Sequence, residues 1–175
     1  MMDSRQVSKP CEDELLVVLK DKIAYAAIRG RGSFQIAPAI KKFCLSVIGQ
    51  ECNHLVIDMS ECIGMDSTFM GSVAGLAGRL KKTNQTLELI NLSEKNAQLL
   101  KTLGVDQVLS FYKDAHGHQL SVQKTTTLPT DQTSQKEMAE TALQAHEKLV
   151  QISDENLPKF KQVIELLKED VDRLN

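Results

Sequence analysis

The segment Leu55–Gly71 constrains the fold of this chain more than any other stretch. It begins with the continuous apolar run Leu55–Ile57, a pattern typical of a central strand in a parallel sheet. A polar turn ends the run. A second turn then carries Asp66, Ser67 and Thr68 directly before a helix-like stretch of small and apolar residues. The segment therefore predicts a buried strand followed by a helix that starts next to a hydroxyl group.

Apolar periodicity extends this pattern to both sides. It predicts strands at about 15–19, 23–28, 54–59, 87–92 and 108–112. Helices are expected at about 34–49, with Ser33 as N-cap, at about 67–82, and between Ser93 as N-cap and Gly104 as the residue after the C-terminus. Alternation of strands and helices through 23–112 predicts an α/β fold with a mixed, mostly parallel sheet of about five strands.

Composition changes beyond this alternating region. We expect a domain over residues 14–124, which includes a further edge strand at 119–124, and then a polar linker over 125–134. Residues 135–175 predict two amphipathic helices, and Pro158 marks the start of the second. Such helices pack either on their own domain, in a homodimer seam or on a partner, and the pattern leaves these alternatives open.

Bulk properties exclude several classes of protein. A net charge of −2 and an aromatic content of 4% provide neither the basic stripe nor the stacking platforms of a nucleic-acid-binding protein. No run approaches the roughly 18 apolar residues of a membrane span, and the N-terminus does not read as a signal peptide. The four cysteines form no Cys-x-x-Cys pair, so we expect a reduced, cytoplasmic protein that does not contact a membrane.

Two short motifs carry a family resemblance. Val56–Ser60 ends a strand with Ile-Asp-Met-Ser, and Met65–Thr68 follows with Met-Asp-Ser-Thr. With the order of elements over about 14–113, they resemble the STAS domain, and in particular its anti-sigma-factor-antagonist branch. In that branch the serine after the aspartate is phosphorylated by a kinase that is also an anti-sigma factor. The resemblance implies that Ser67 is the phosphorylation site, with a serine-kinase anti-sigma factor and a serine phosphatase as partners.

The sequence departs from the family pattern in two places. Phe69 and Met70 replace Gly and Leu after the Ser-Thr pair, and a bulky aromatic is expected to alter the exposed surface that a kinase reads. Gly30–Ser33 lacks an acidic residue that the family often has, and a basic one appears at Arg31. The residues expected to bind the partner are Arg31, Ser33, Asp66, Ser67, Thr68, Phe69 and Met70.

A phosphate suits the start of a helix, where backbone N–H groups lack partners and the helix dipole is positive. It adds a charge of about −1.5 to −2, so its effect would come from partner recognition rather than unfolding. Arg29 and Arg31 are expected at the same sheet edge, where they could contact it. The alternative is that Asp66 or Ser67 only caps the helix.

These observations favour a non-enzymatic regulatory module switched by serine phosphorylation in a partner-switching pathway of transcription control. No nucleophile–base or metal set converges in the sequence, and His116 and His118 are more typical of a solvated loop, so no cofactor or metal is expected. The first alternative is an unphosphorylated STAS scaffold that oligomerises through its C-terminal helices. A weaker alternative is a module that binds a small ligand.

Overall fold

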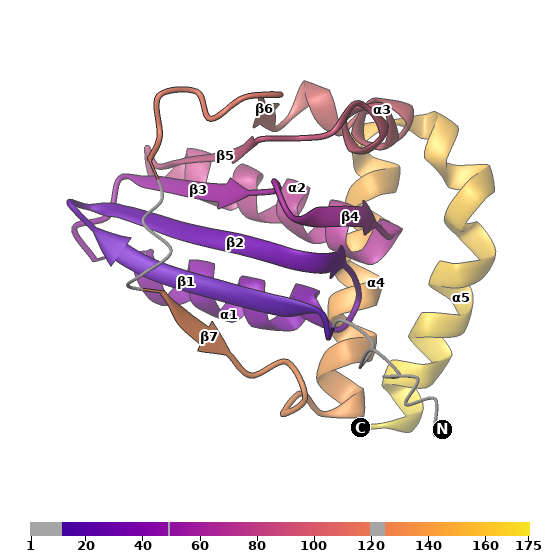
Figure 1. Cartoon of the computed structure of the whole chain (residues 1–175). Coiled ribbons are helices and arrows are strands. Elements are labelled where there is room, and N and C mark those ends of the chain that lie inside the picture. The colour runs from indigo at the N-terminus through magenta and orange to yellow at the C-terminus, as the bar shows by residue number, and fades with distance from the viewer. Residues whose placement is uncertain (1–11, 49, 120–124) are drawn as a thin grey trace, which may run out of the picture.

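The computed structural model describes residues 12–48, 50–119 and 125–175. It contains a seven-stranded sheet with helices (Figure 1). The strands are β1 Glu14–Lys20, β2 Ile23–Gly32, β3 His54–Asp58, β4 Cys62–Met65, β5 Thr86–Ile90, β6 Ser110–Phe111 and β7 Thr126–Leu128. The helices are α1 Ile36–Val47, α2 Ser67–Lys82, α3 Glu94–Thr102, α4 Gln135–Ile152 and α5 Leu157–Arg173, with short 3-10 turns η1 Val105–Gln107 and η3 Asp154–Asn156.

The sheet is mixed and mostly parallel, which confirms the predicted fold class. Its strand order is β6-β5-β3-β2-β1-β7, and β4 pairs with the end of β2 outside this path. Strands β2, β3, β5 and β6 run parallel, whereas β1 is antiparallel to both β2 and β7. The two strands beyond the predicted five are β4 and β7. Both are short, and β4 contains a glycine, so neither has the apolar alternation that identifies a strand in a sequence.

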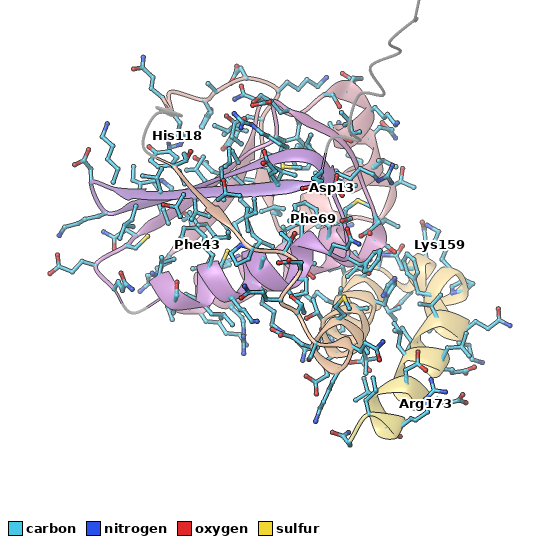
Figure 2. The ribbon with its side chains drawn as sticks, turned by 60° about the horizontal axis from the view of Figure 1, so that its bottom comes forward. Asp13, Phe43, Phe69, His118, Lys159 and Arg173 are labelled. Carbon is cyan, nitrogen blue, oxygen red and sulfur yellow. The ribbon has the colours of Figure 1, made fainter. Side chains whose placement is uncertain are left out.

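Both faces of the central strands are buried, each against a different set of residues. Leu55 and Ile57 of β3 point into the main core with the apolar residues of α1 and α2. Val56 points to the opposite face, where it packs in a small cluster with Tyr25 and Ile90. His118 lies on this second face, away from α1 (Figure 2), and bonds to the buried Glu88. The continuous apolar run of β3 thus reflects a strand covered on both sides.

The structure confirms three predicted helix signals. The Ser93 hydroxyl accepts a hydrogen bond from the Asn96 amide at the start of α3. Gly104 follows α3 with a positive φ of 72°, which glycine adopts without strain. Pro158 lies in the first turn of α5. Helix α2 has the predicted bounds.

The prediction that Ser33 caps the first helix was wrong. Helix α1 begins at Ile36, and its N-cap residue Gln35 makes no side-chain cap bond. Ser33 is buried and its hydroxyl donates to Asp13 Oδ2 at 3.4 Å. The Phe34 amide just after it donates instead to Asp66 Oδ2 at 2.7 Å. Two carboxylates from distant segments therefore organise this turn, and sequence spacing does not reveal them.

The expected linker contributes to the sheet. Its residues Thr126–Leu128 form β7, which extends the sheet beyond β1, and Leu128 packs against the core. The edge strand predicted at 119–124 lies almost entirely outside the described residues.

The two C-terminal helices fold back onto the domain. Figure 1 shows α4 (orange) beside the ends of β1, β2 and β4, with α5 (yellow) on its outer side. Ala145 and Leu149 of α4 are buried, and α4 crosses α2 so closely that a Cβ added at Gly71 would lie 2.6 Å from the carbonyl carbon of Ala145. Helix α5 packs on α4 and contains no fully buried residue. Within the part of the chain that the structure describes, no helix has the length and apolarity needed to cross a membrane.

Candidate functional site

The candidate site is the start of α2, which Asp66 fixes in place. Its Oδ1 accepts a hydrogen bond from the Phe69 amide at 2.8 Å, so Asp66 is the N-cap of the helix. Its Oδ2 accepts from the Phe34 amide, and its own amide donates to the Gly32 carbonyl at 2.9 Å. One carboxylate thus ties the start of α2 to the connection between β2 and α1. The capping role belongs to Asp66, which leaves the Ser67 hydroxyl free for another partner.

That partner is His146 of α4. The Ser67 Oγ and His146 Nε2 lie 2.9 Å apart, and they belong to residues 79 positions apart in the chain. His146 is 5% exposed, whereas Ser67 is only partly buried. His146 Nδ1 lies 2.7 Å from the Ala142 carbonyl, which can only accept a hydrogen bond. Nδ1 therefore carries the proton, and in the neutral ring Nε2 accepts the hydrogen bond that Ser67 donates.

The groups around the Ser67–His146 hydrogen bond determine its chemical role. Phe160 of α5 lies edge-on to the His146 ring, with centroids 5.0 Å apart. A serine hydroxyl that donates to an imidazole is the arrangement found in a nucleophile–base pair of an enzyme. In such enzymes a carboxylate bonds the second ring nitrogen, whereas here that nitrogen bonds a backbone carbonyl. Helices α4 and α5 cover the pair. The arrangement holds the hydroxyl of the partly exposed Ser67 in a hydrogen bond with α4.

Most of the other predicted site residues are not on the surface. Thr68, Phe69 and Met70 are buried in the core, at 6%, 0% and 5% exposure. Phe69 was expected to alter the exposed surface, and this was wrong. Its ring packs flat against Gly32, where an added Cβ would lie 2.8 Å from Cδ1. Figure 2 shows Phe69 inside the molecule. The glycine opposite makes room for the ring, so the aromatic residue faces inward.

The two arginines have different surroundings. Arg29 Nε donates to Glu61 Oε1 at 3.0 Å, and Nη1 lies 3.7 Å from Glu14 Oε2. Arg31 is exposed, and its backbone amide donates to Asp13 Oδ1 at 2.8 Å. Neither side chain contacts the Ser67 hydroxyl. Of the two, Arg31 is the one whose guanidinium has no ion pair with a described carboxylate.

The sequence reasoning missed three residues of this region. Ile63 on β4 is 70% exposed and Phe34 is 48% exposed, and both lie next to segments that position Asp66. Each exposes an apolar side chain near the start of α2. His146 was also missed, because a lone histidine in an amphipathic helix gives no sign of the distant serine that it meets. The helix periodicity does place it beside Ala142, Ala145 and Leu149, on the face that packs inward.

The described residues offer no metal centre, since no group of three potential ligand side chains among them is suitably placed. His116 stacks on Tyr112 with ring centroids 3.5 Å apart, whereas His118 bonds Glu88 and lies 3.5 Å from the Tyr25 hydroxyl. The two histidines therefore have separate structural roles.

Comparison with known proteins agrees with this architecture. The protein TM1081 of Thermotoga maritima, described as a candidate anti-sigma factor antagonist, is matched by its NMR structure at a TM-score of 0.54 and 14% identity, over 70% of this chain and 99% of TM1081. Its crystal structure gives 0.50 and 15%, over 55% and 83%. A sulfate transporter family protein of Wolinella succinogenes gives 0.50 and 20%, over 57% and 83%. At these identities the likeness shows the fold alone.

No curated protein sequence matches the chain. The family model of the STAS domain matches residues 17–118, which is more than half of the sequence, and this confirms the resemblance seen in the motifs. The match ends before α4, so His146 and both C-terminal helices lie outside the matched region. The chain belongs to the STAS domain family.

Proposed function

We propose that this protein is a non-enzymatic regulatory module that works as an anti-sigma-factor antagonist in the cytoplasm, and that phosphorylation of Ser67 switches its partner. One observation supports this most directly. The Ser67 hydroxyl begins α2 beside the capping Asp66, and a helix from outside the STAS region engages it through His146. In this proposal the Ser67–His146 contact opens locally, while α4 stays part of the fold, and the opened contact presents the hydroxyl to a kinase.

The proposed partner surface surrounds the start of α2. Arg31, Phe34 and Ile63 are exposed there, and they supply one charge and two apolar side chains. Thr68, Phe69, Met70 and Ser33 would contribute by shaping the surface from beneath rather than by contact. A serine-kinase anti-sigma factor would bind this surface while Ser67 is unmodified. The added charge of about −1.5 to −2 would weaken that contact, and a serine phosphatase would restore it.

Phosphorylation should also act on α4. A phosphoryl group on Ser67 would occupy the space between the hydroxyl and His146, whose ring is held on its other side by Phe160. The bulk of the group opposes docking, although a protonated His146 would attract it. We expect the steric effect to dominate, because the ring is buried and a hydrogen-bond distance of 2.9 Å leaves no room for a phosphoryl group.

The test is phosphate mapping by mass spectrometry after incubation with ATP and a serine-kinase anti-sigma factor encoded in the same genome. Wild-type protein should be modified at Ser67, and the Ser67→Ala variant should not. His146→Ala should be modified faster than wild type, because it loosens the cover. An unmodified Ser67 in His146→Ala, together with equal kinase binding by Ser67→Asp and wild type, would remove this proposal.

A second candidate function rests on α5. Val163, Leu166 and Leu174 are 38%, 61% and 38% exposed, so this helix carries apolar side chains that α4 does not cover. A scaffold that forms a homodimer through α5 would bury them. Light scattering after size exclusion should then report a dimer for wild type and a monomer for Leu166→Lys. A wild-type monomer at high concentration would rule this function out.

A further inference from the structure

A groove of about 340 Å³ lies between α1, α2 and α4. The glycines of α2 create it. At Gly71 the backbones of α2 and α4 are in close contact, but at Gly75 and Gly78 the nearest atoms belong to the side chain of Lys148. An added Cβ at Gly75 would lie 3.9 Å from Lys148 Cγ, and one at Gly78 would lie 3.6 Å from Nζ. The lysine stem thus runs along the glycines and brings its ammonium group to the groove.

Three cations from three helices line this groove, namely Lys41 of α1, Arg79 of α2 and Lys148 of α4. None of them forms an ion pair with a described carboxylate. Lys41 Nζ donates to the neutral Gln144 Oε1 at 2.6 Å. The one carboxylate that lines the groove, Glu147, lies 3.2 Å from Lys168 Nζ on α5. The three cations of the groove therefore have no ion-pair partner among the described carboxylates.

These cations oppose one another. Burial lowers the pKa of Lys41, and the positive charge of Arg79 lowers it further, whereas Glu137 and Glu140 act in the opposite direction. Glu137 is itself paired with Lys42. Like charges brought together in a partly buried groove destabilise the fold unless an anion joins them.

Two hydroxyl groups add hydrogen-bonding capacity. Ser72 is 9% exposed and Thr141 is 3% exposed, and both line the groove. Neither hydroxyl has a hydrogen-bond partner among the described residues, and neither oxygen is fully buried, so both can bond a ligand. Their positions on α2 and α4 put them on opposite walls, where a bound ligand with acceptor oxygens could bond both.

From these features we infer that the groove binds a small phosphate-bearing ligand, held by Lys41, Arg79 and Lys148 and by the hydroxyls of Ser72 and Thr141. Phosphate oxygens are hydrogen-bond acceptors with multiple negative charge, so they match a site made of cations and hydroxyls. No aromatic residue lines the groove, so nothing there would stack on a nucleotide base. The volume is at the lower end for small-molecule sites, which suits a compact polyanion.

This site does not depend on phosphorylation of Ser67. It does have a mechanical consequence, because a ligand that joins α1, α2 and α4 would stabilise the docked position of α4. Hydrogen exchange in α4 should therefore slow when the groove is filled, whether or not Ser67 is a switch.

The experiment is isothermal titration calorimetry of the full chain with inorganic pyrophosphate at about 0.15 M salt, where attraction to scattered surface charges is screened. Wild type should bind saturably. Arg79→Gln and Lys148→Gln should each weaken binding about tenfold or more, since each removes a charge-assisted hydrogen bond. Lys81→Gln, which removes an exposed cation of α2 outside the groove lining, should leave binding within about twofold.

Three results would overturn the inference. They are the absence of saturable pyrophosphate binding by wild type, an equal loss in Lys81→Gln and Arg79→Gln, and binding that is unchanged in both groove variants. Arg79 is exposed and has no ion pair with a described residue, so Arg79→Gln should fold like wild type, and circular dichroism with thermal melting checks this. Slower hydrogen exchange in α4 upon pyrophosphate addition to wild type, and not to Arg79→Gln, locates the ligand in the groove.

Discussion

At the scale of single residues, the contact between α2 and α4 depends on one glycine. Gly71 and Gly75 lie one turn apart on α2, yet their surroundings differ. The first faces the backbone of Ala145, which has no freedom to move aside, and the second faces the flexible side chain of Lys148. The two positions therefore form a matched pair for testing how α4 docks.

We predict that Gly71→Ala and Gly75→Ala change stability in opposite directions. Gly71→Ala should cost about 1–3 kcal/mol, because the new methyl group overlaps the Ala145 carbonyl and pushes α4 away. Gly75→Ala should gain up to about 1 kcal/mol from helix propensity, since its Cβ makes only ordinary contacts. Urea denaturation measures both. Equal effects in the two variants would contradict the close approach of the helices.

Asp66 provides a second test at this scale. Asp66→Ala should lower the free energy of unfolding by about 1–2 kcal/mol, because it removes the cap of α2. Asp66→Asn should lose less, since one amide oxygen can still accept from Phe69 but the NH₂ group cannot accept from Phe34. If thermal or urea unfolding gives the same loss for both variants, the two bonds do not contribute separately.

At the scale of elements, α4 and α5 differ in how much they bury. Helix α4 contributes Thr141, Ala145, His146 and Leu149 to the interior, whereas α5 has no fully buried residue. Asn156 between them is buried and donates to the carbonyls of Leu103 and Leu149 at 2.9 and 2.8 Å. Helix α4 is thus an integral layer of the fold, and α5 is its outer support.

Truncation should reveal this difference. A chain that ends at residue 156 lacks α5 and should remain folded with a moderate loss of stability. A chain that ends at Leu128 lacks both helices. It uncovers the side of α2 that carries Gly71 and the part of the core that Leu149 covers, so it should bind hydrophobic dyes and aggregate. Dye fluorescence and size exclusion check both chains. A well-behaved 1–128 chain as stable as the full protein would show that α4 contributes little.

The sequence predicted the elements of this fold better than their contacts. The bounds of α2, the cap at Ser93 and the glycine at Gly104 follow from local rules, because each depends on residues within one turn. Strand β4 was missed since its pairing with β2 depends on a remote partner. Ser33 was predicted to be the N-cap of the first helix. Instead its hydroxyl bonds Asp13, and the amide of the next residue bonds Asp66. In the candidate site, Ser67 was found from its motif, whereas His146 was not.

At the scale of the whole molecule, the buried thiol of Cys44 makes the stability of the fold depend on pH. Cys44 is fully buried in α1, and burial raises the pKa of its thiol far above the ordinary 9.0. Above pH 9 the unfolded chain therefore loses this proton while the folded chain keeps it. The folded state binds more protons, so its stability falls as the pH rises.

The corresponding prediction compares wild type with Cys44→Ala. The free energy of unfolding of wild type should fall above about pH 9 by up to about 1.4 kcal/mol per pH unit more steeply than that of the variant. Lys41, with its lowered pKa, contributes the opposite slope in both proteins and cancels in the difference. Urea denaturation between pH 8 and 10 measures the two slopes. Parallel curves would mean that the thiol ionises in the folded state.

The sequence by itself determined the order of five strands and the helices, the family and the position of the hydroxyl at the start of α2, because periodicity, caps and short motifs are written in neighbouring residues. Only the tertiary structure decided that His146 covers this hydroxyl, that Phe69 faces inward against Gly32, and that Lys41, Arg79 and Lys148 share a groove. These are contacts between segments far apart in the chain. They depend on how whole faces of helices pack, and no local pattern encodes that geometry.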